Sequence, residues 1–174
     1  MPSAKLILLD DFKYSEWATR RLLTAAAALT PEERLRNLGL SHRSVLETLH
    51  HIFLSEQLWS ECLIANALPP MHTIGRGAPP PIPPLEILAA EWVRLTANAR
   101  TWLAALPEDA LDATLASELA PGGAVAHLAR WQILRHTINH ATLHRGQIIS
   151  MLRMLGKQPP NVDVMTCCLE RTVN

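Results

Sequence analysis

The sequence predicts an all-α fold, a four-helix bundle with a long Pro-rich crossover between its second and third helices. The 174 residues include 29 Leu and 23 Ala but only 6 Val, 10 Ile and 7 Gly, and Leu and Ala favour helices whereas β-branched residues favour strands. Apolar residues recur at helical spacing in four long segments. More than half of the 13 Pro lie in one stretch between the second and third segments. A chain of this length fits one domain, and we expect it to span residues 1–174.

The first predicted helix covers about residues 6–29, and a short turn follows it. Thr30 has the character of an N-cap, Pro31 occupies the first helical position, and Glu33 completes a capping box. We expect this extra turn to end near Gly39.

The second predicted helix runs from Ser41 or Ser44 to Leu68. Ser44 and Glu47 form another capping-box pattern at its start. Residues 69–84 then form the Pro-rich connector, which favours an extended polyproline conformation. We interpret it as a stiff crossover that lets the next helix start at the far end of a bundle.

The third and fourth helices are predicted over residues 84–106 and from a start within 124–127 to Gly156. A break at 120–123, which contains Pro and two Gly, separates them. Pro residues beyond Gly156 are the expected stop signal. Residues 161–174 are expected to form a final turn packed on the bundle.

Charge and hydropathy exclude several classes of function. Lys plus Arg equals Asp plus Glu at 16 each, so no basic stripe is available for nucleic acid. No apolar run approaches the ~20 residues of a membrane span, and the N-terminus lacks the apolar core of a signal peptide. We therefore expect a cytoplasmic protein with neither nucleic-acid nor membrane partners.

The three Cys lack the spacing of a disulfide framework. We expect Cys62 to be a small buried residue and Cys167 and Cys168 to be spare thiols.

The last predicted helix carries three histidines on one face. His136, His140 and His144 are spaced by four residues, so their side chains stack along the helix. A helical wheel places them with Ile133 and other apolar residues, toward the core. The arginines of this helix, including Arg145, fall about 140° away at 100° per residue and are expected to face solvent.

Two histidines four residues apart on a helix are a recurrent metal-binding pair. The intervening Glu of the zinc-protease motif is absent here, so that class is disfavoured. A third ligand would come from a facing helix, and His50 and His51 are the candidates, with His51 on the more inward arc. The alternative is a hydrogen-bonded histidine cluster without metal. His42 and the other turn histidines, His72 and His127, have no assigned role.

Glu47 precedes His51 by one helical turn. It is a candidate base or hydrogen-bond acceptor for a ligand, although its capping role with Ser44 is the preferred interpretation.

Three stretches resemble the DinB-like family, also called the DinB/YfiT-like metalloenzymes, in the family's order. They are residues 14–22 (YSEWATRRL), residues 48–52 (TLHHI) followed by Trp59, and residues 139–147 (NHATLHRGQ). The last is the most specific, because it resembles the family's Asn-His-x-x-x-His-Arg-Gly-Gln signature. The similarity spans nearly the whole chain.

The resemblance implies a four-helix bundle in which His51, His140 and His144 hold a divalent metal, Zn, Ni, Fe or Mn. His136 and Glu47 become candidates for supporting the ligands, and no catalytic residue is assigned. Arg145 is expected to face solvent or a partner subunit. With three ligands evident, we expect an open coordination position.

The resemblance also implies a homodimer and a small-molecule substrate. The first hypothesis is a metal-dependent enzyme, either a thiol-dependent transferase acting with a low-molecular-weight thiol or a hydrolase. The second is a non-catalytic, metal-stabilised binding or stress-response protein, and the third is a metal-free interaction module.

Overall fold

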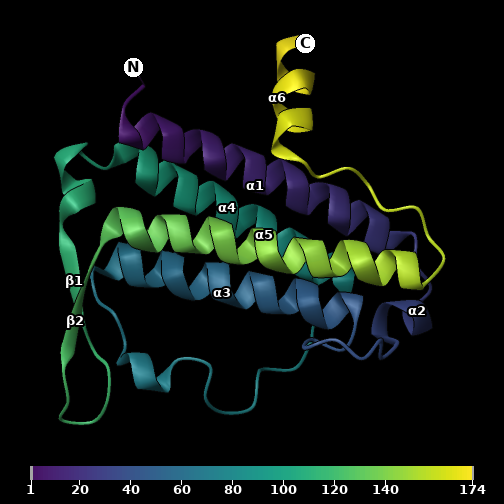
Figure 1. Ribbon diagram of the computed structural model, residues 1–174, viewed down its shortest axis with the longest axis horizontal. Helices are drawn as coiled ribbons and strands as arrows, with labels where there is room; N and C mark the ends of the chain where they lie inside the picture. The colour runs from purple at the N-terminus through teal and green to yellow at the C-terminus, as the bar shows by residue number, and fades with distance from the viewer. Residues whose placement is uncertain (1, 174) are drawn as a thin grey trace.

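The computed structural model describes residues 2–173 and is mostly helical. Four long helices lie side by side (Figure 1): α1 (Ala4–Ala27), α3 (Val45–Ala65), α4 (Leu85–Ala105) and α5 (Arg130–Met154). Both α1 and α3 pack against α4 and α5. Helices α1 and α5 run in one direction and α3 and α4 in the other. Over residues 2–173, the helices are too short or too polar to cross a bilayer.

The N-caps of two helices follow the sequence prediction. In the short helix α2 (Pro31–Leu35), Thr30 and Glu33 form the complete capping box. At the start of α3, Ser44 Oγ accepts a hydrogen bond from the Glu47 N–H (3.2 Å). The Glu47 carboxylate, however, does not return to Ser44. It accepts from the Arg43 N–H (2.9 Å) and pairs with the Arg43 guanidinium.

The segment 66–84 links α3 to α4 and contains one short 3₁₀ turn, η1 (Met71–Thr73). It runs back along the outside of α3 (Figure 1), which allows α3 and α4 to point the same way. This segment therefore forms a wall beside α3.

A β-hairpin precedes α5, and the sequence prediction missed it. After a second 3₁₀ turn, η2 (Asp109–Asp112), strand β1 (Thr114–Glu118) pairs antiparallel with β2 (Val125–Ala129). Helix α5 therefore starts at Arg130, not within 124–127. The physical reason is that the backbone of the preceding residues is used in the strand ladder, while Gln132 caps the helix by accepting from the Ala129 N–H (2.9 Å).

The C-terminal segment forms a ten-residue helix, α6 (Val164–Val173), instead of the final turn that was predicted. It projects away from the long helices (Figure 1). Side chains join it to α1: the Trp17 Nε1–H donates to Glu170 (3.1 Å), and Arg171 pairs with Asp10.

The core between the helices includes one buried carboxyl group. Trp92 is 2 % exposed, and its Nε1–H donates to the Glu56 carboxyl (2.6 Å). Burial raises the pKa of Glu56, because desolvation disfavours the charged form. A small cavity of about 20 Å³ adjoins Glu56 between the helices.

Arg145 is buried, so the prediction that it faces solvent or a partner subunit is wrong. Its side chain is 1 % exposed, and its guanidinium donates to Ser15 Oγ and Thr142 Oγ1, both at 2.8 Å. The guanidinium also lies 5.3 Å from the centre of the Tyr14 ring. The helical wheel failed because α5 packs against α3 on one side and α1 on the other. Side chains about 140° from the histidines on the helical wheel therefore face a second buried interface, the one with α1.

We predict that Arg145→Leu lowers the free energy of unfolding of the metal-free protein by about 3 kcal/mol, because it leaves buried polar partners unsatisfied. Urea unfolding at neutral pH measures the change. Arg153→Leu, at an exposed position on the same helix, is the matched control and should cost less than about 0.5 kcal/mol. Equal effects of the two substitutions would contradict this account of Arg145.

Candidate metal centre

Three of the predicted histidines meet where α3 packs against α5. The Nε2 atom of His140 lies 3.2 Å from the Nε2 atom of His51 on α3 and 3.2 Å from that of His144, one turn further along α5. His144 is 7 % exposed, and the rings of His51 and His144 are 4.5 Å apart at their centres. The helix pair thus directs three imidazole nitrogens toward one another.

Gln147 fixes which nitrogen of His144 carries the proton. The Gln147 amide group donates through Nε2 to Ser41 Oγ (3.3 Å), so its Oε1 faces His144 Nδ1 at 2.8 Å. An amide oxygen only accepts hydrogen bonds, so His144 is protonated at Nδ1. Its Nε2 therefore presents a lone pair to the centre of the cluster.

Hydrogen bonds among the three imidazoles do not satisfy all of their nitrogens. If His140 is protonated at Nε2, its single hydrogen there can bond only one of the two neighbouring nitrogens. Its Nδ1 then carries a lone pair that is buried and has no hydrogen-bond partner. If His140 is unprotonated at Nε2, its lone pair faces that of His144. A cation among the three Nε2 atoms would take up all three of their lone pairs, with His140 then protonated at Nδ1. Zinc binds imidazole at 2.0–2.1 Å, which separates tetrahedral ligand nitrogens by about 3.4 Å, close to the spacing here.

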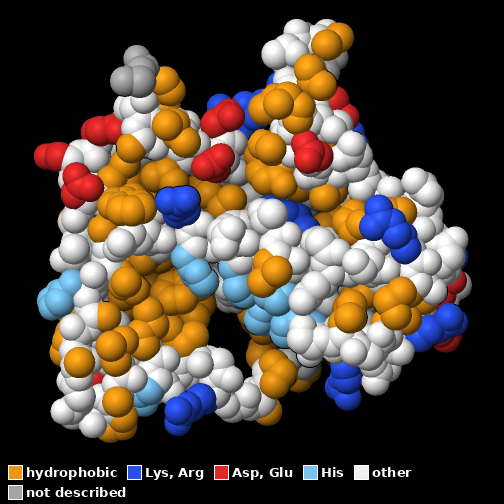
Figure 2. All heavy atoms as spheres, in the orientation of Figure 1, with side chains coloured by type: hydrophobic (Ala, Val, Ile, Leu, Met, Phe, Trp, Pro, Cys, Tyr) orange, Lys and Arg blue, Asp and Glu red, His pale blue; other side chains and the backbone are white. Residues whose placement is uncertain are grey.

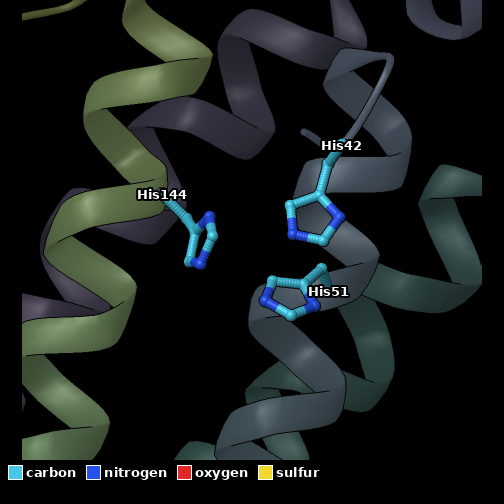
Figure 3. Close-up of side chains that lie close together, drawn as sticks. All are labelled: His42, His51 and His144. Atoms are coloured by element: carbon cyan, nitrogen blue, oxygen red, sulfur yellow. The ribbon is translucent and has the colours of Figure 1, made fainter. Parts of the chain in front are cut away.

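A fourth histidine, His42, lies beside the cluster (Figure 3). Its ring stacks on that of His51, with centres 3.8 Å apart and planes 24° apart. Ligand nitrogens of His42, His51 and His144 all lie within 4.8 Å of one another. The sequence analysis gave His42 no role, because a residue in the irregular segment before α3 has no helical periodicity that would indicate its direction.

Comparison with known proteins identifies the family of the chain. Residues 1–168 match the sequence profile of the DinB family. The chain belongs to the DinB family. A relative named "Protein DinB" from Bacillus subtilis (strain 168) is 24 % identical over 145 residues, which cover 83 % of this chain and 84 % of that protein. The resemblance inferred from the sequence motifs is thus confirmed.

The other candidate residues of this DinB-family protein surround the cluster without joining it. The His136 ring lies 5.2 Å from that of Trp59 and 5.6 Å from that of His140, measured between centres. His50 is 5 % exposed and makes no ring contact with the cluster. Glu47 binds Arg43, as described above, and its charge partly offsets the lowering of the His42 pKa that burial and His144 cause.

Burial favours the neutral form of two members of the cluster, His51 and His140. Desolvation, followed by the neighbouring imidazoles, lowers the pKa of His51 and of His140 to about 4. Burial also lowers the pKa of His42, His50 and His136. Neutral imidazole is the form that binds metals, so His51 and His140 are in a form that can act as ligands at neutral pH.

A groove of about 1290 Å³ opens from the cluster and is bounded by α3, α5, the 66–84 segment and the hairpin. Figure 2 shows histidines in the middle of this face and hydrophobic side chains gathered beside them. The apolar lining includes Leu54, Leu58, Trp59, Ile74, Ile82 and Leu128. The missed hairpin therefore has a role: Ser117 Oγ in β1 donates to the Pro69 carbonyl (2.7 Å) and holds two walls of the groove together.

We predict that the metal-free protein loses stability as the pH falls from about 7 to about 5. In this range the unfolded chain, with histidine pKa near 6.5, binds more protons than the folded chain, whose His51 and His140 have pKa values of about 4. Stability then rises with pH. Urea unfolding at the two pH values tests this, and the double variant His51→Gln/His140→Gln should show a smaller pH dependence. An unchanged pH dependence in the double variant would contradict the assignment.

Proposed function

We propose that this protein is a metal-dependent enzyme in which His51, His140 and His144 hold one divalent ion. In this proposal the four long helices form the family's four-helix bundle, with residues 69–84 as its crossover. The observation that carries the proposal is the convergence of three Nε2 atoms, two of the contacts at 3.2 Å, in a cluster that protons do not satisfy.

Three neutral imidazoles leave the full charge of a Zn, Ni, Fe or Mn ion in place. When bound, such an ion lowers the pKa of a coordinated water or thiol or polarises an oxygen. The ligand types do not select among these metals, because affinity also follows geometry and availability.

The groove supports a small-molecule substrate whose apolar part lies along α3 and the 66–84 segment. We propose a low-molecular-weight thiol as one reactant, in a transfer or hydrolysis reaction. Arg76, which also lines the groove, supplies a cation for an acidic group of that molecule. His136 lines the groove near His140, and burial lowers its pKa, so a neutral imidazole is available there to accept a proton.

The second candidate function is a non-catalytic protein in which the ion only joins α3 to α5. The proximity of His42 favours it, because a fourth protein ligand would close the coordination shell, and closed shells are typical of structural sites. Ligand exchange at the ion distinguishes the two functions, because an ion in an enzyme exchanges a ligand and an ion in a closed structural site does not.

Elemental analysis by ICP-MS of protein purified without a His tag tests the proposal. We expect about one metal ion per chain, lost in the double variant His140→Ala/His144→Ala because too few ligands remain to retain it. His127→Ala, at an exposed position in β2, is the control and should keep the metal. Wild-type protein that remains metal-free after reconstitution with Zn or Ni would overturn the proposal.

Gln147→Leu should weaken metal binding about 10- to 100-fold, because the residue that orients a histidine ligand contributes to affinity on this scale. Competition with a chelator of known affinity measures the change. Gln158→Leu, beyond α5 and exposed, should bind metal as the wild type does. Equal metal affinity for Gln147→Leu and wild type would show that the Nδ1 contact of His144 is unimportant.

A further inference from the structure

We propose that His42 is a fourth, displaceable ligand of the metal centre. It completes the coordination shell when the groove is empty and gives up its position to a thiol that enters from the groove. This inference rests on the metal site proposed above. It explains how an ion with four histidines nearby can still bind a substrate.

The first argument is proximity. Ligand nitrogens of His42, His51 and His144 lie within 4.8 Å of one another, and the centres of the His42 and His144 rings are 5.1 Å apart. Tetrahedral ligands of a zinc-sized ion are separated by about 3.4 Å, so in this proposal His42 joins the shell by a rotation of its side chain toward the cluster.

The second argument is the difference in how the four histidines are held. His51, His140 and His144 project from two long helices packed against each other. His42 lies in the irregular segment 36–44, which turns at Gly39 (φ +75°). Rotation of the half-buried side chain of His42 breaks few contacts, whereas a shift of a helix disrupts the core. His42 is therefore the member of the set that can leave.

The loop is also joined to the ligand set by a specific contact. Ser41, next to His42, accepts a hydrogen bond from Gln147 Nε2 (3.3 Å), and the same Gln147 accepts from His144 through Oε1 (2.8 Å). At the other side of His42, Arg43 pairs with Glu47 on α3. These two contacts hold His42 over the cluster, and its side chain remains half-buried.

The third argument is direction. The groove is lined by His42, His51 and His140, so a molecule in the groove reaches the ion from the side on which His42 lies. In the exchange, the metal–nitrogen bond to His42 breaks and a metal–sulfur bond forms. The thiol proton passes to the solvent, so atoms and charge balance.

Cobalt(II) reports both states, because tetrahedral four-coordinate cobalt absorbs more strongly in the visible than five- or six-coordinate cobalt. Metal-free full-length protein is loaded with Co(II) and then titrated with 2-mercaptoethanol, which adds a sulfur-to-cobalt charge-transfer band. The variants are His42→Ala, His42→Phe and the control His127→Ala. His42→Phe keeps an aromatic ring stacked on His51 but removes the nitrogens, so it separates ligation from packing.

For wild type we expect an intense four-coordinate spectrum. Both His42 variants should give a weaker spectrum, bind Co(II) about 10-fold less tightly, and reach half-saturation with 2-mercaptoethanol at a several-fold lower concentration, since the competing ligand is gone. His127→Ala should match wild type.

Two negative outcomes are distinguishable. If wild type binds Co(II) but His42→Phe has the same spectrum and the same thiol half-saturation, the role of His42 is overturned and the three-histidine site stands. If wild type binds no Co(II), the proposed metal site fails, and this inference fails with it.

Discussion

The packing of α3 against α5 brings the imidazoles of His51, His140 and His144 into contact, and the arrangement of the site follows from that constraint. Imidazole nitrogens removed from water need partners. Here His140 has two nitrogen neighbours at 3.2 Å and a buried Nδ1 without a partner. A divalent ion would take up the Nε2 lone pairs together, whereas protons satisfy them one contact at a time. Gln147 completes the arrangement by fixing the proton of His144 on the outer nitrogen.

Helix α5 serves two buried interfaces, and the residues of its NHATLHRGQ segment divide between them. His140 and His144 face α3, while Arg145 reaches Ser15 on α1 (2.8 Å). Gln147 extends to the loop before α3. The segment therefore links α1, α3 and the loop that carries His42. The same helix also lines the groove beside β2. Helix α5 therefore positions both the hairpin wall and the histidine end of the groove.

Much of the fold was predictable because it depends on local rules. Helical periodicity and the Ser44 N-cap predicted the long helices to within a few residues, and the Thr30 N-cap predicted the short helix α2. The hairpin was missed because its strands are five residues each and rich in Ala and Leu, so pairing across the turn, not propensity, decides their conformation. Arg145 was misplaced because a helical wheel cannot show that a helix has two buried sides. The juxtaposition of His51 with His140 and His144 was anticipated, but the position of His42 depends on how an irregular loop folds back on α3.

The central claim is that these histidines form the coordination shell of one divalent ion. X-ray absorption at the zinc edge of the zinc-loaded protein tests it most directly, because the spectrum gives ligand type and distance. The account predicts nitrogen ligands at about 2.0–2.1 Å with the outer-shell scattering of several imidazoles. Sulfur ligands at about 2.3 Å in the absence of added thiol, or an ion with only one imidazole, would contradict it.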